Sequence, residues 1–590
     1  MMAVFLVSTT KDHDTVGPLL SSNKMYLNPK MRHMQVVSGV LVAMLFLTVY
    51  MIMSSKCLNG LQHLAAHMGA STFQRSSKET NSQQLANPKE RHEEAKGQLV
   101  YSLKNQVRGH HNTENTGGES LEHEVARREV ERVSDELKMY VHAKLMQIKK
   151  LASDPILVKE VNNILEISAD IHKKLKSEQS RLANTVDGAG EWRKLENLQL
   201  TDLVQRRLEF LQNPSDCDKA KQILCKLVVT ECGYGCQLHH VTFCLIMAYA
   251  TQRTLILKSE GWRYAPKGWE SVFLPISKTC RFKSDMAASQ WGPNSTMDNS
   301  QVIELPQVGK LSWRPHFLPP AIPEDIADHL TCIHGDPAAW WVGQFVTYVT
   351  RPNAMMQKFL NEGKEKLGFT NPIVGVQVRR TDKLISEAKF HSVDEYMHHV
   401  VEWYDIYEKK HPGVQRKVYI ATDDPGVLHE AKKNYPNYTF VSDNEVSKSA
   451  DRGSRYTDAS LRGIILDVYL LSRCNYLVCT FSSNVCRAAY ELMQSLQGDA
   501  SECCKSLDHT YSFEDDHLHS FIAVEDHQSQ REGEISFNAG DTIRLTDNQW
   551  DVYCQGTNVK TGKSGLFPSY KTVKKIERVK MITYSEVPDS

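Results

Sequence analysis

The sequence predicts an α/β body with a parallel sheet, preceded by a membrane-spanning segment and two long helices and followed by a small all-β module. Three observations support this prediction. Short apolar runs alternate with amphipathic segments between residues 200 and 505, as in strands and helices that build a parallel sheet. Before this region, apolar residues recur at helical spacing, and after it short strands are separated by turn residues.

The membrane-spanning segment is predicted at residues 36–54. Its uncharged core, VVSGVLVAMLFLTVYMIM, would span about 27 Å as a helix, enough for a thin bilayer. Several basic residues precede it and Lys56 alone follows closely, so the positive-inside rule leaves residues 1–35 in the cytosol and the rest in a lumen. A cleaved signal peptide is the alternative, but the long preceding stretch and the lack of a small-residue cleavage site disfavour it.

Two segments connect the membrane anchor to the body. Residues 55–120 are rich in Ser, Gln, Asn, Lys and Glu and predict a flexible stem. Residues 121–185 predict two long helices broken near Pro155, because apolar residues recur at three- and four-residue steps: Val130, Val133, Leu137, Tyr140, Ile148, Leu151, Val158, Val161, Leu165 and Leu175. This stripe could pack on the chain's own body, but its position favours a coiled coil, so we expect a homodimer.

Charge and cysteine content narrow the classes of function. The 70 basic and 70 acidic side chains cancel, which argues against nucleic-acid binding and makes any anion site local. In an oxidising lumen, disulfides are the default for the 14 cysteines. A zinc site at Cys232 and Cys236 is the alternative, disfavoured because CGYGC has a three-residue gap and no matching second pair.

A local anion site is predicted at the stretch VGVQVRRTDK, residues 374–383, where a buried strand ends in two arginines. Ligands of parallel sheets lie outside the carboxyl ends of the strands, where Arg379, Asp423, Asp424 and Ser482 to Ser483 would meet. In a secretory lumen, the expected ligand is a nucleotide sugar. The guanidinium groups of Arg379 and Arg380 can hold its phosphates without a metal.

The neighbouring carboxylates Asp423 and Asp424 do not predict a metal site. Adjacent residues of an extended segment point to opposite faces, so one cation cannot easily meet both. We expect one of the two to accept a hydrogen bond from a ligand hydroxyl, with Asp424 as the candidate, or to act as an internal partner for an arginine. The alternative is a turn aspartate that caps the helix after Pro425.

The last module, residues 515–576, resembles an SH3 barrel in the order AVEDH, acidic loop, GDTI, tryptophan and GLFPSYKTV. A groove for polyproline uses several aromatic residues. Here Val524 to His527 stand where tyrosines are usual, which leaves Trp550, Pro568 and Tyr570. We therefore expect the module to dock protein or glycan rather than polyproline, with residues 577–590 as a tail.

Six stretches together resemble the α-1,6-fucosyltransferases that add core fucose to N-glycans: CGYGCQLHH, WRYAPKGWE, VRRTDK, ATDDP, SLRGIILD and LVCTFSSNVCR. The resemblance implies a Rossmann-like body of GT-B type and a single-pass type II Golgi membrane protein. It also implies transfer of L-fucose from GDP-β-L-fucose to the 6-hydroxyl of the innermost GlcNAc of an N-glycoprotein, with inversion and without a metal or other cofactor. Two alternatives stay open: another donor or acceptor, or a Golgi scaffold or glycan-binding protein with an inactive or retuned site.

The resemblance also implies roles for single residues. Arg379 grips the β-phosphate with support from Arg380, and Glu387 is the general base on the acceptor hydroxyl with Lys383 beside it. The remaining donor contacts are the nucleoside-holding Tyr264 and Asp467, the glycines Gly233 and Gly235 that let the backbone approach the donor, and Ser483 at a helix start suited to phosphate. As alternatives, the glycines serve only a disulfide turn, and Asp467 is a helix-surface carboxylate.

Gln377 departs from the family pattern, since a histidine that helps hold the guanine usually stands there. Glutamine also offers a donor and an acceptor, so the contact can survive in altered geometry. Losing one good hydrogen bond would weaken donor binding by a few-fold to about tenfold.

Disulfides and glycosylation sequons complete the expectations. Similar enzymes imply the bridges Cys217–Cys280, Cys225–Cys244, Cys232–Cys236 and Cys479–Cys486. The state of the other cysteines stays open: Cys57, Cys332, Cys474, Cys503, Cys504 and Cys554. Asn294 and Asn437 stand in N-x-T sequons, which can be used only in a lumen and on an exposed surface.

Overall fold

The computed structural model describes residues 121–186, 188–227, 232–292, 299–307, 309–311, 313–380, 389–443, 455–513, 520–547, 552–581 and 583–587. The predicted anchor at 36–54 and stem at 55–120 lie outside these residues. Within the described ranges, no helix combines the length and the apolar character needed to cross a membrane.

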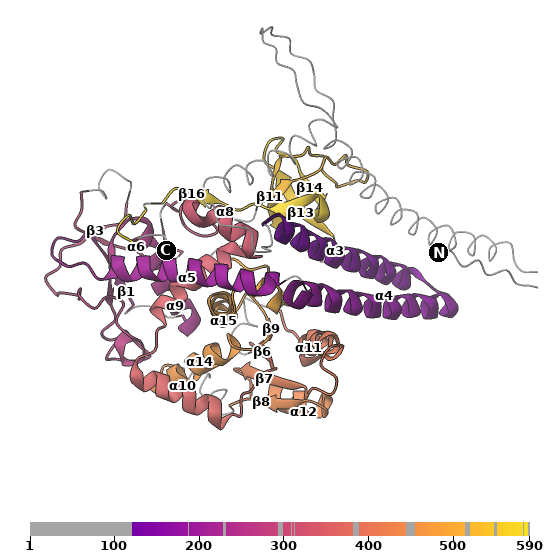
Figure 1. The fold of residues 1–590 in the computed structure, drawn as a ribbon, viewed down its shortest axis with the longest axis horizontal. Helices are drawn as coiled ribbons and strands as arrows, with labels where there is room; N and C mark the ends of the chain where they lie inside the picture. Colours follow the sequence, from indigo (N-terminus) through magenta and orange to yellow (C-terminus); the bar gives the residue numbers. More distant parts are fainter. Residues whose placement is uncertain are drawn as a thin grey trace, which may run out of the picture. The chain divides into compact units, whose positions relative to one another are not determined.

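The two predicted long helices are confirmed as α3 (Leu121–Leu151) and α4 (Pro155–Arg181), which pack against each other (Figure 1). The break between them has a local cause. Asp154 caps α4, because its side chain accepts a hydrogen bond from the Ile156 amide at 2.9 Å. Pro155 then begins the helix, where its missing N–H costs nothing. The coiled-coil dimer stays a prediction.

The α/β body is confirmed, but it contains two separate parallel sheets. The first has the order β2-β1-β4-β3 and is all parallel. Its strands are β1 (Gln222–Lys226), β2 (Thr254–Lys258), β3 (Ser289–Gln290) and β4 (Val302–Glu304). The helix α6 (Tyr234–Ala250) connects β1 to β2 and is buried almost throughout, as expected from its apolar sequence.

The second sheet has the order β10-β9-β6-β7-β8 and is also all parallel. Its strands are β6 (Val374–Val378), β7 (Lys417–Thr422), β8 (Thr439–Val441), β9 (Tyr476–Cys479) and β10 (Cys504–Ser506). In Figure 1, α11 (Val393–Glu408) and α12 (Gly426–Asn434) lie beside this sheet, as do α10 (Ala354–Lys366) and α14 (Asp458–Leu471). Val374, Val376 and Val378 face the cluster built with α11 and α12, so Gly375 and Gln377 face the α14 side.

Further helices join the two halves of the body. These are α5 (Ala189–Gln212), α8 (Glu324–Ile333), α9 (Pro337–Val349) and α15 (Asn484–Leu496). Helix α15, which follows β9 of the second sheet, packs against α9. It also packs against α6, which connects β1 to β2 of the first sheet, so the two halves are in contact. One large apolar core runs through these contacts.

The predicted all-β module is confirmed as a sheet of order β14-β13-β12-β11-β15, with antiparallel pairs. Its strands are β11 (Ser520–Ala523), β12 (Thr542–Asp547), β13 (Tyr553–Asn558), β14 (Ser564–Pro568) and β15 (Thr572–Lys574). A small core of its own lies inside, with Ile535, Phe537, Ile543 and Phe567 buried.

The segment expected as a tail packs on the body instead. Strand β16 (Arg578–Val579) pairs in parallel with β5 (Ile322–Pro323). Tyr584 is 3% exposed, and its hydroxyl donates to the Tyr249 carbonyl oxygen at 2.8 Å. The chain that leaves the all-β module thus adds to the core of the α/β body.

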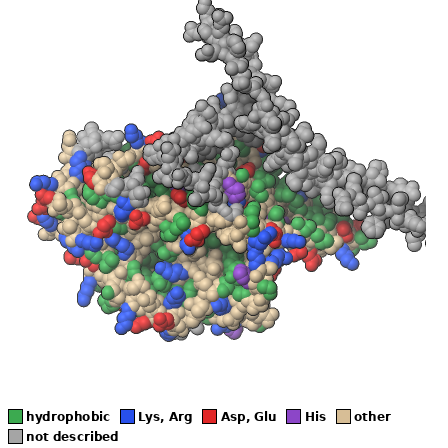
Figure 2. Space-filling model, viewed as in Figure 1, with side chains coloured by type: hydrophobic (Ala, Val, Ile, Leu, Met, Phe, Trp, Pro, Cys, Tyr) green, Lys and Arg blue, Asp and Glu red, His purple; other side chains and the backbone are tan. Residues whose placement is uncertain are grey.

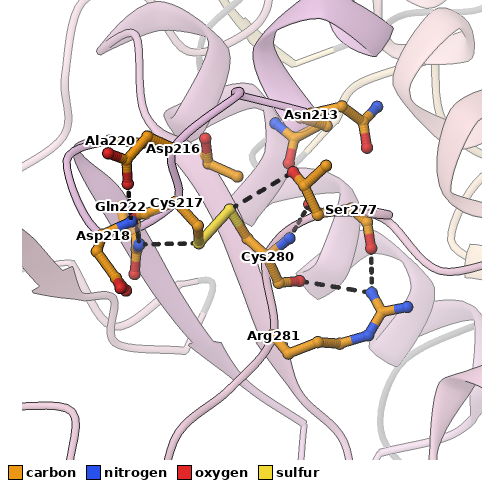
Figure 3. The surroundings of a disulfide bond; sticks show 12 residues. Asn213, Asp216, Cys217, Asp218, Ala220, Gln222, Ser277, Cys280 and Arg281 are labelled. Carbon is orange, nitrogen blue, oxygen red and sulfur yellow. Dashed lines mark hydrogen bonds between the residues drawn. A yellow bond between two sulfur atoms is a disulfide. The ribbon is translucent and has the colours of Figure 1, made fainter.

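All four implied disulfides are present, which makes the zinc reading of Cys232 and Cys236 wrong. Figure 3 shows the surroundings of Cys217–Cys280, where the Gln222 side-chain amide donates to the Cys217 carbonyl oxygen at 2.6 Å. Among the other cysteines of the described ranges, Cys332, Cys474, Cys503 and Cys504 hold free thiols.

Candidate functional site

The predicted phosphate-binding arginine lies at the carboxyl end of β6. Arg379 directly follows this strand, and Asp423 directly follows the neighbouring strand β7. Arg379 Nη1 lies 2.8 Å from Asp423 Oδ2, and the side chains are 19% and 2% exposed. Parallel strands bring together two residues that are 44 positions apart, and the buried carboxylate fixes the direction of the guanidinium group.

The second arginine has different partners. Arg380 Nη1 donates to Glu430 Oε2 of α12 at 2.9 Å, and the guanidinium lies over the Phe390 ring at 4.7 Å. Its backbone amide donates to Asp423 Oδ1 at 2.9 Å. Arg380 therefore anchors the end of β6 to α12, while its charge remains beside the site.

Asp424 matches the turn alternative. Its Oδ1 accepts a hydrogen bond from the Gly426 amide at 2.8 Å, and its own amide donates to Thr422 Oγ1 at 3.1 Å. The side chain is 35% exposed and lies 3.7 Å from Arg380 Nη1. A contact between Asp424 and a ligand stays a prediction.

Tyr264 comes from the first half of the body and reaches the start of α6. Its hydroxyl accepts a hydrogen bond from the Tyr234 amide at 3.1 Å, because the N-cap residue Gly233 has no side chain to do so. The ring is 3% exposed and lies 4.9 Å from the Tyr456 ring. Burial raises the pKa of Tyr264 to about 12. Its role toward a nucleoside stays a prediction.

Gly233 and Gly235 of CGYGC lie in different surroundings. A Cβ on Gly235 would lie 2.8 Å from the Asn484 carbonyl carbon, so glycine is required where α6 touches α15. A Cβ on Gly233 would meet no described atom within 4 Å, which leaves open space beside this backbone. The first turns of α6 and α15 therefore lie side by side, and helix N-termini favour anions.

Ser483 is the N-cap residue of α15 and is 2% exposed. Its amide donates to the Thr480 carbonyl oxygen at 2.9 Å, and its side chain forms no capping hydrogen bond. Arg487, in the first turn of the same helix, was not predicted as a site residue. It donates to the carbonyl oxygens of Ser512 and Phe513 at 3.0 and 3.1 Å. These bonds tie the first turn of α15 to the segment after β10, although a cation at a helix N-terminus interacts unfavourably with the helix dipole.

Gln377 and Asp467 lie on the same side of the second sheet. Gln377 is 4% exposed, and within the described ranges its Oε1 has no hydrogen-bond partner. Tyr419, on the same face of β7, donates from its hydroxyl to Asp467 Oδ1 of α14 at 2.6 Å. Asp467 is 5% exposed, so its reading as a helix-surface carboxylate is wrong. A buried amide oxygen without a hydrogen-bond partner lowers stability by about 1–3 kcal/mol. A ligand that donates a hydrogen bond to Gln377 Oε1 would remove this cost.

Asp467 makes stability depend on pH. Burial raises the pKa of Asp467 to about 7, although the Tyr419 hydroxyl acts to lower it. The folded protein therefore binds more protons than the unfolded chain between about pH 4 and pH 7, and the free energy of unfolding falls as pH rises through this window. In the wild type, Asp467 should lower the free energy of unfolding by up to about 1.4 kcal/mol per pH unit in this window. In Asp467→Asn this contribution should be absent.

Thermal unfolding midpoints from about pH 5 to about pH 8 test this prediction. The midpoint of the Asp467→Asn variant should fall less with pH than that of the wild type. As a matched control, Tyr419→Phe keeps the burial but loses the hydrogen bond, so it should extend the fall to higher pH. Parallel curves for wild type and Asp467→Asn would contradict the assignment.

A buried cluster that the sequence did not reveal joins α6 to α15. His239 Nε2 lies 2.9 Å from Glu491 Oε2, and the Tyr511 hydroxyl donates to Glu491 Oε1 at 2.8 Å. His239 Nδ1 lies 2.9 Å from the Gly235 carbonyl oxygen, so both ring nitrogens have hydrogen-bond partners. Glu491 is 0% exposed. The cluster holds the Gly235 turn against α15, and no local pattern signals it because its partners are 252 residues apart.

Neither of two possible metal-ligand groups in the described ranges lies at the ends of β6 and β7. One contains Cys225 and Cys244, which form a disulfide, together with His240. The other lies on α11, where Glu402 pairs with Lys138 of α3. A cavity of about 40 Å³ beside the Cys217–Cys280 disulfide is lined by none of the predicted site residues. The predicted base Glu387 and its neighbour Lys383 lie outside the described residues.

Comparison with known proteins gives matches along most of the chain. The family described as alpha-(1,6)-fucosyltransferase N- and catalytic domains matches residues 48–512, and a variant SH3 domain matches residues 523–572. The alpha-(1,6)-fucosyltransferase of Drosophila melanogaster is 43% identical over 472 residues, which cover 79% of this chain and 75% of the relative. That of Caenorhabditis elegans is 43% identical over 392 residues, which cover 66% and 70%. A solved structure, fucosyltransferase NodZ from Bradyrhizobium, is 15% identical with a TM-score of 0.29, over 46% of this chain and 92% of that chain.

Proposed function

Because the chain belongs to the alpha-(1,6)-fucosyltransferase family and is a fucosyltransferase, we propose that it moves L-fucose from GDP-β-L-fucose to the innermost GlcNAc of N-glycans. The observation that carries the donor assignment is that Arg379 and the start of α15 follow the neighbouring parallel strands β6 and β9, while the start of α6 touches the start of α15. A guanidinium fork and two helix N-termini form a binding site for a diphosphate. We also propose that the two-sheet body is of GT-B type.

The donor would be held along the carboxyl edge of the second sheet. Arg379 contacts the β-phosphate, the unpartnered Gln377 Oε1 and Asp467 lie where the guanine binds, and Gly233 leaves room for the ligand. Glu387 is the proposed base. The acceptor oxygen attacks C1 of fucose from the opposite side, the C1–O bond to GDP breaks, and Glu387 takes the hydroxyl proton. Fixed positive charge then stabilises the departing GDP, which needs no metal for this step.

The test is transfer by the purified protein from GDP-fucose to a GlcNAc-terminated N-glycopeptide, with EDTA present. Formation of the α-1,6-linked product supports the proposal. A protein that is inert with GDP-fucose but transfers from another nucleotide sugar contradicts the donor assignment. Transfer that stops with EDTA and returns with a divalent cation contradicts metal independence.

Gln377→His is expected to tighten donor binding by a few-fold to about tenfold, because the variant restores the residue usual at this position. Gln377→Leu is the matched control, since it keeps a similar volume but removes the amide oxygen, and it should weaken donor binding. Calorimetric titration with GDP measures both. Equal affinity for all three proteins would show that Gln377 does not contact the guanine.

We also propose that the hairpin of α3 and α4 forms the homodimer. Lys173 and Asp405, 2.5 Å apart, and Arg128 and Asp499, 2.6 Å apart, anchor one side of the hairpin to the body. Large apolar side chains on both helices are more than 40% exposed: Val130, Val133, Leu137, Ile148, Leu151, Ile164, Ile167, Ile171 and Leu175. Figure 2 shows hydrophobic side chains along this hairpin. Their spacing suits packing against a second copy.

Leu137→Lys with Ile171→Lys is expected to convert the dimer to a monomer without loss of stability, because both positions are exposed, at 58% and 62%. Light scattering coupled to size-exclusion chromatography measures the mass. Glu166→Lys is the control, since it adds positive charge to α4 away from the stripe. If the double variant keeps the mass of a dimer, the hairpin does not form the dimer interface.

The remaining proposals concern location and the all-β module. We infer a single-pass type II protein of the Golgi membrane, with the body in the lumen, from the predicted segment at 36–54. The SH3 module would dock protein or glycan. In support, His527 is only 6% exposed, and its backbone is hydrogen-bonded to that of Phe537, so it adds little surface to a groove. Tyr570 is 43% exposed, but without a second exposed ring at His527 part of the aromatic surface that polyproline needs is missing.

A further inference from the structure

The tripeptide Asn437-Tyr438-Thr439 covers the turn after α12 and the first residue of β8. The Tyr438 amide donates to the Tyr435 carbonyl oxygen at 3.1 Å and closes the turn. Asn437 and Thr439 are exposed, whereas Tyr438 is partly buried. The tripeptide therefore presents its two recognition residues to solvent and its middle residue to the protein.

The middle residue fixes this orientation. The Tyr438 hydroxyl accepts a hydrogen bond from Arg416 Nη1 at 2.8 Å, and its ring lies 6.1 Å from the Tyr404 ring. The Tyr438 ring thus packs on the core between the sheet and α11. Because Asn437 lies on the solvent side of the same turn, a large group on its side chain would displace no core atom.

The turn is also far from the donor site along the sheet. Strand β8 is parallel to β7 and begins two residues after Asn437, so Asn437 lies at the amino edge of the sheet. Arg379 and Asp423 lie at the opposite, carboxyl edge. A group on Asn437 is therefore separated from the reacting atoms by the length of the strands.

We propose that Asn437 carries an N-linked glycan, an inference that rests on the luminal location proposed above. The carbohydrate comes from a lipid diphosphate-linked oligosaccharide. Asn437 Nδ2 forms a bond to C1 of the first sugar, and the C1–O bond to the diphosphate breaks. The lipid diphosphate leaves with the electron pair, and the amide loses one proton.

The glycan would also protect strand β8. Because β8 is an edge strand, a bulky polar group beside it hinders edge-to-edge pairing with another chain.

The test uses the full chain expressed in cells with a secretory pathway, with Asn294→Gln in every protein so that the other N-x-T sequon adds no glycan. Enzymatic removal of N-glycans in heavy-oxygen water should convert Asn437 to a labelled aspartate, detectable in its peptide. Asn437→Gln and Thr439→Ala should lose the gel shift on deglycosylation, whereas Thr439→Ser should retain it. Fucosyl transfer should be unchanged in all of them.

Two further measurements separate this inference from the proposed function. Protease protection of isolated membranes reports whether the body is luminal, and the transfer assay reports the activity independently. A luminal, active protein with an unlabelled Asn437 overturns the glycan and leaves the function standing. A body that is cleaved from the cytosolic side overturns both the glycan and the luminal location.

Discussion

Arg379→Ala is expected to lower fucosyl transfer by at least about 10²–10³-fold, because it removes a fixed cation from the departing diphosphate. It should also destabilise the protein by up to about 3–5 kcal/mol, since the Asp423 carboxylate is 2% exposed and would lose its ion-pair partner. Transfer kinetics and thermal unfolding measure the two effects separately.

A matched double variant keeps these effects apart. In Arg379→Ala with Asp423→Asn the buried charge is gone, so stability should largely return while transfer stays low. Arg379→Lys retains a charge but not the bidentate fork, so it should transfer at an intermediate rate. If the double variant regained transfer as well as stability, Arg379 would be a structural partner of Asp423 and the diphosphate site would lie elsewhere.

Glu387→Gln is expected to lower transfer by about 10²–10⁴-fold while GDP binds with unchanged affinity. A glutamine is almost isosteric with glutamate but cannot accept the hydroxyl proton. The measurements are the transfer rate at saturating substrates and a calorimetric titration with GDP.

The pH profile provides the control for Glu387. Wild-type transfer should fall at low pH as the base becomes protonated, whereas the residual activity of Glu387→Gln should lack this fall. Near-normal transfer by Glu387→Gln would assign the base to another group. Lost GDP binding would assign Glu387 to the donor site instead.

The local pattern of the sequence determined most of the architecture. Apolar spacing predicted the alternating strands and helices of residues 200–505, the strand that ends at Arg379 and the helix pair α3 and α4, and the break at Pro155 followed from capping chemistry. These features depend on periods of two and 3.6 residues, which a single sequence displays. The arginine pair at the end of β6 was equally visible, because charge after a buried strand is unusual. The disulfide pairing and the base Glu387, by contrast, came from the family resemblance.

Only the tertiary structure decided which partner each charged or polar group has. The same two arginines meet Asp423 and Glu430, Tyr264 bonds to the start of α6, and Gln377 Oε1 remains without a partner in the described ranges. The tertiary structure also divided the parallel strands of residues 200–505 between two sheets. It left the apolar stripe of α3 and α4 exposed. The physical reason is that a hydrogen bond joins atoms within about 3 Å in space. Sheet order and helix packing, which are long-range, decide which residues come that close.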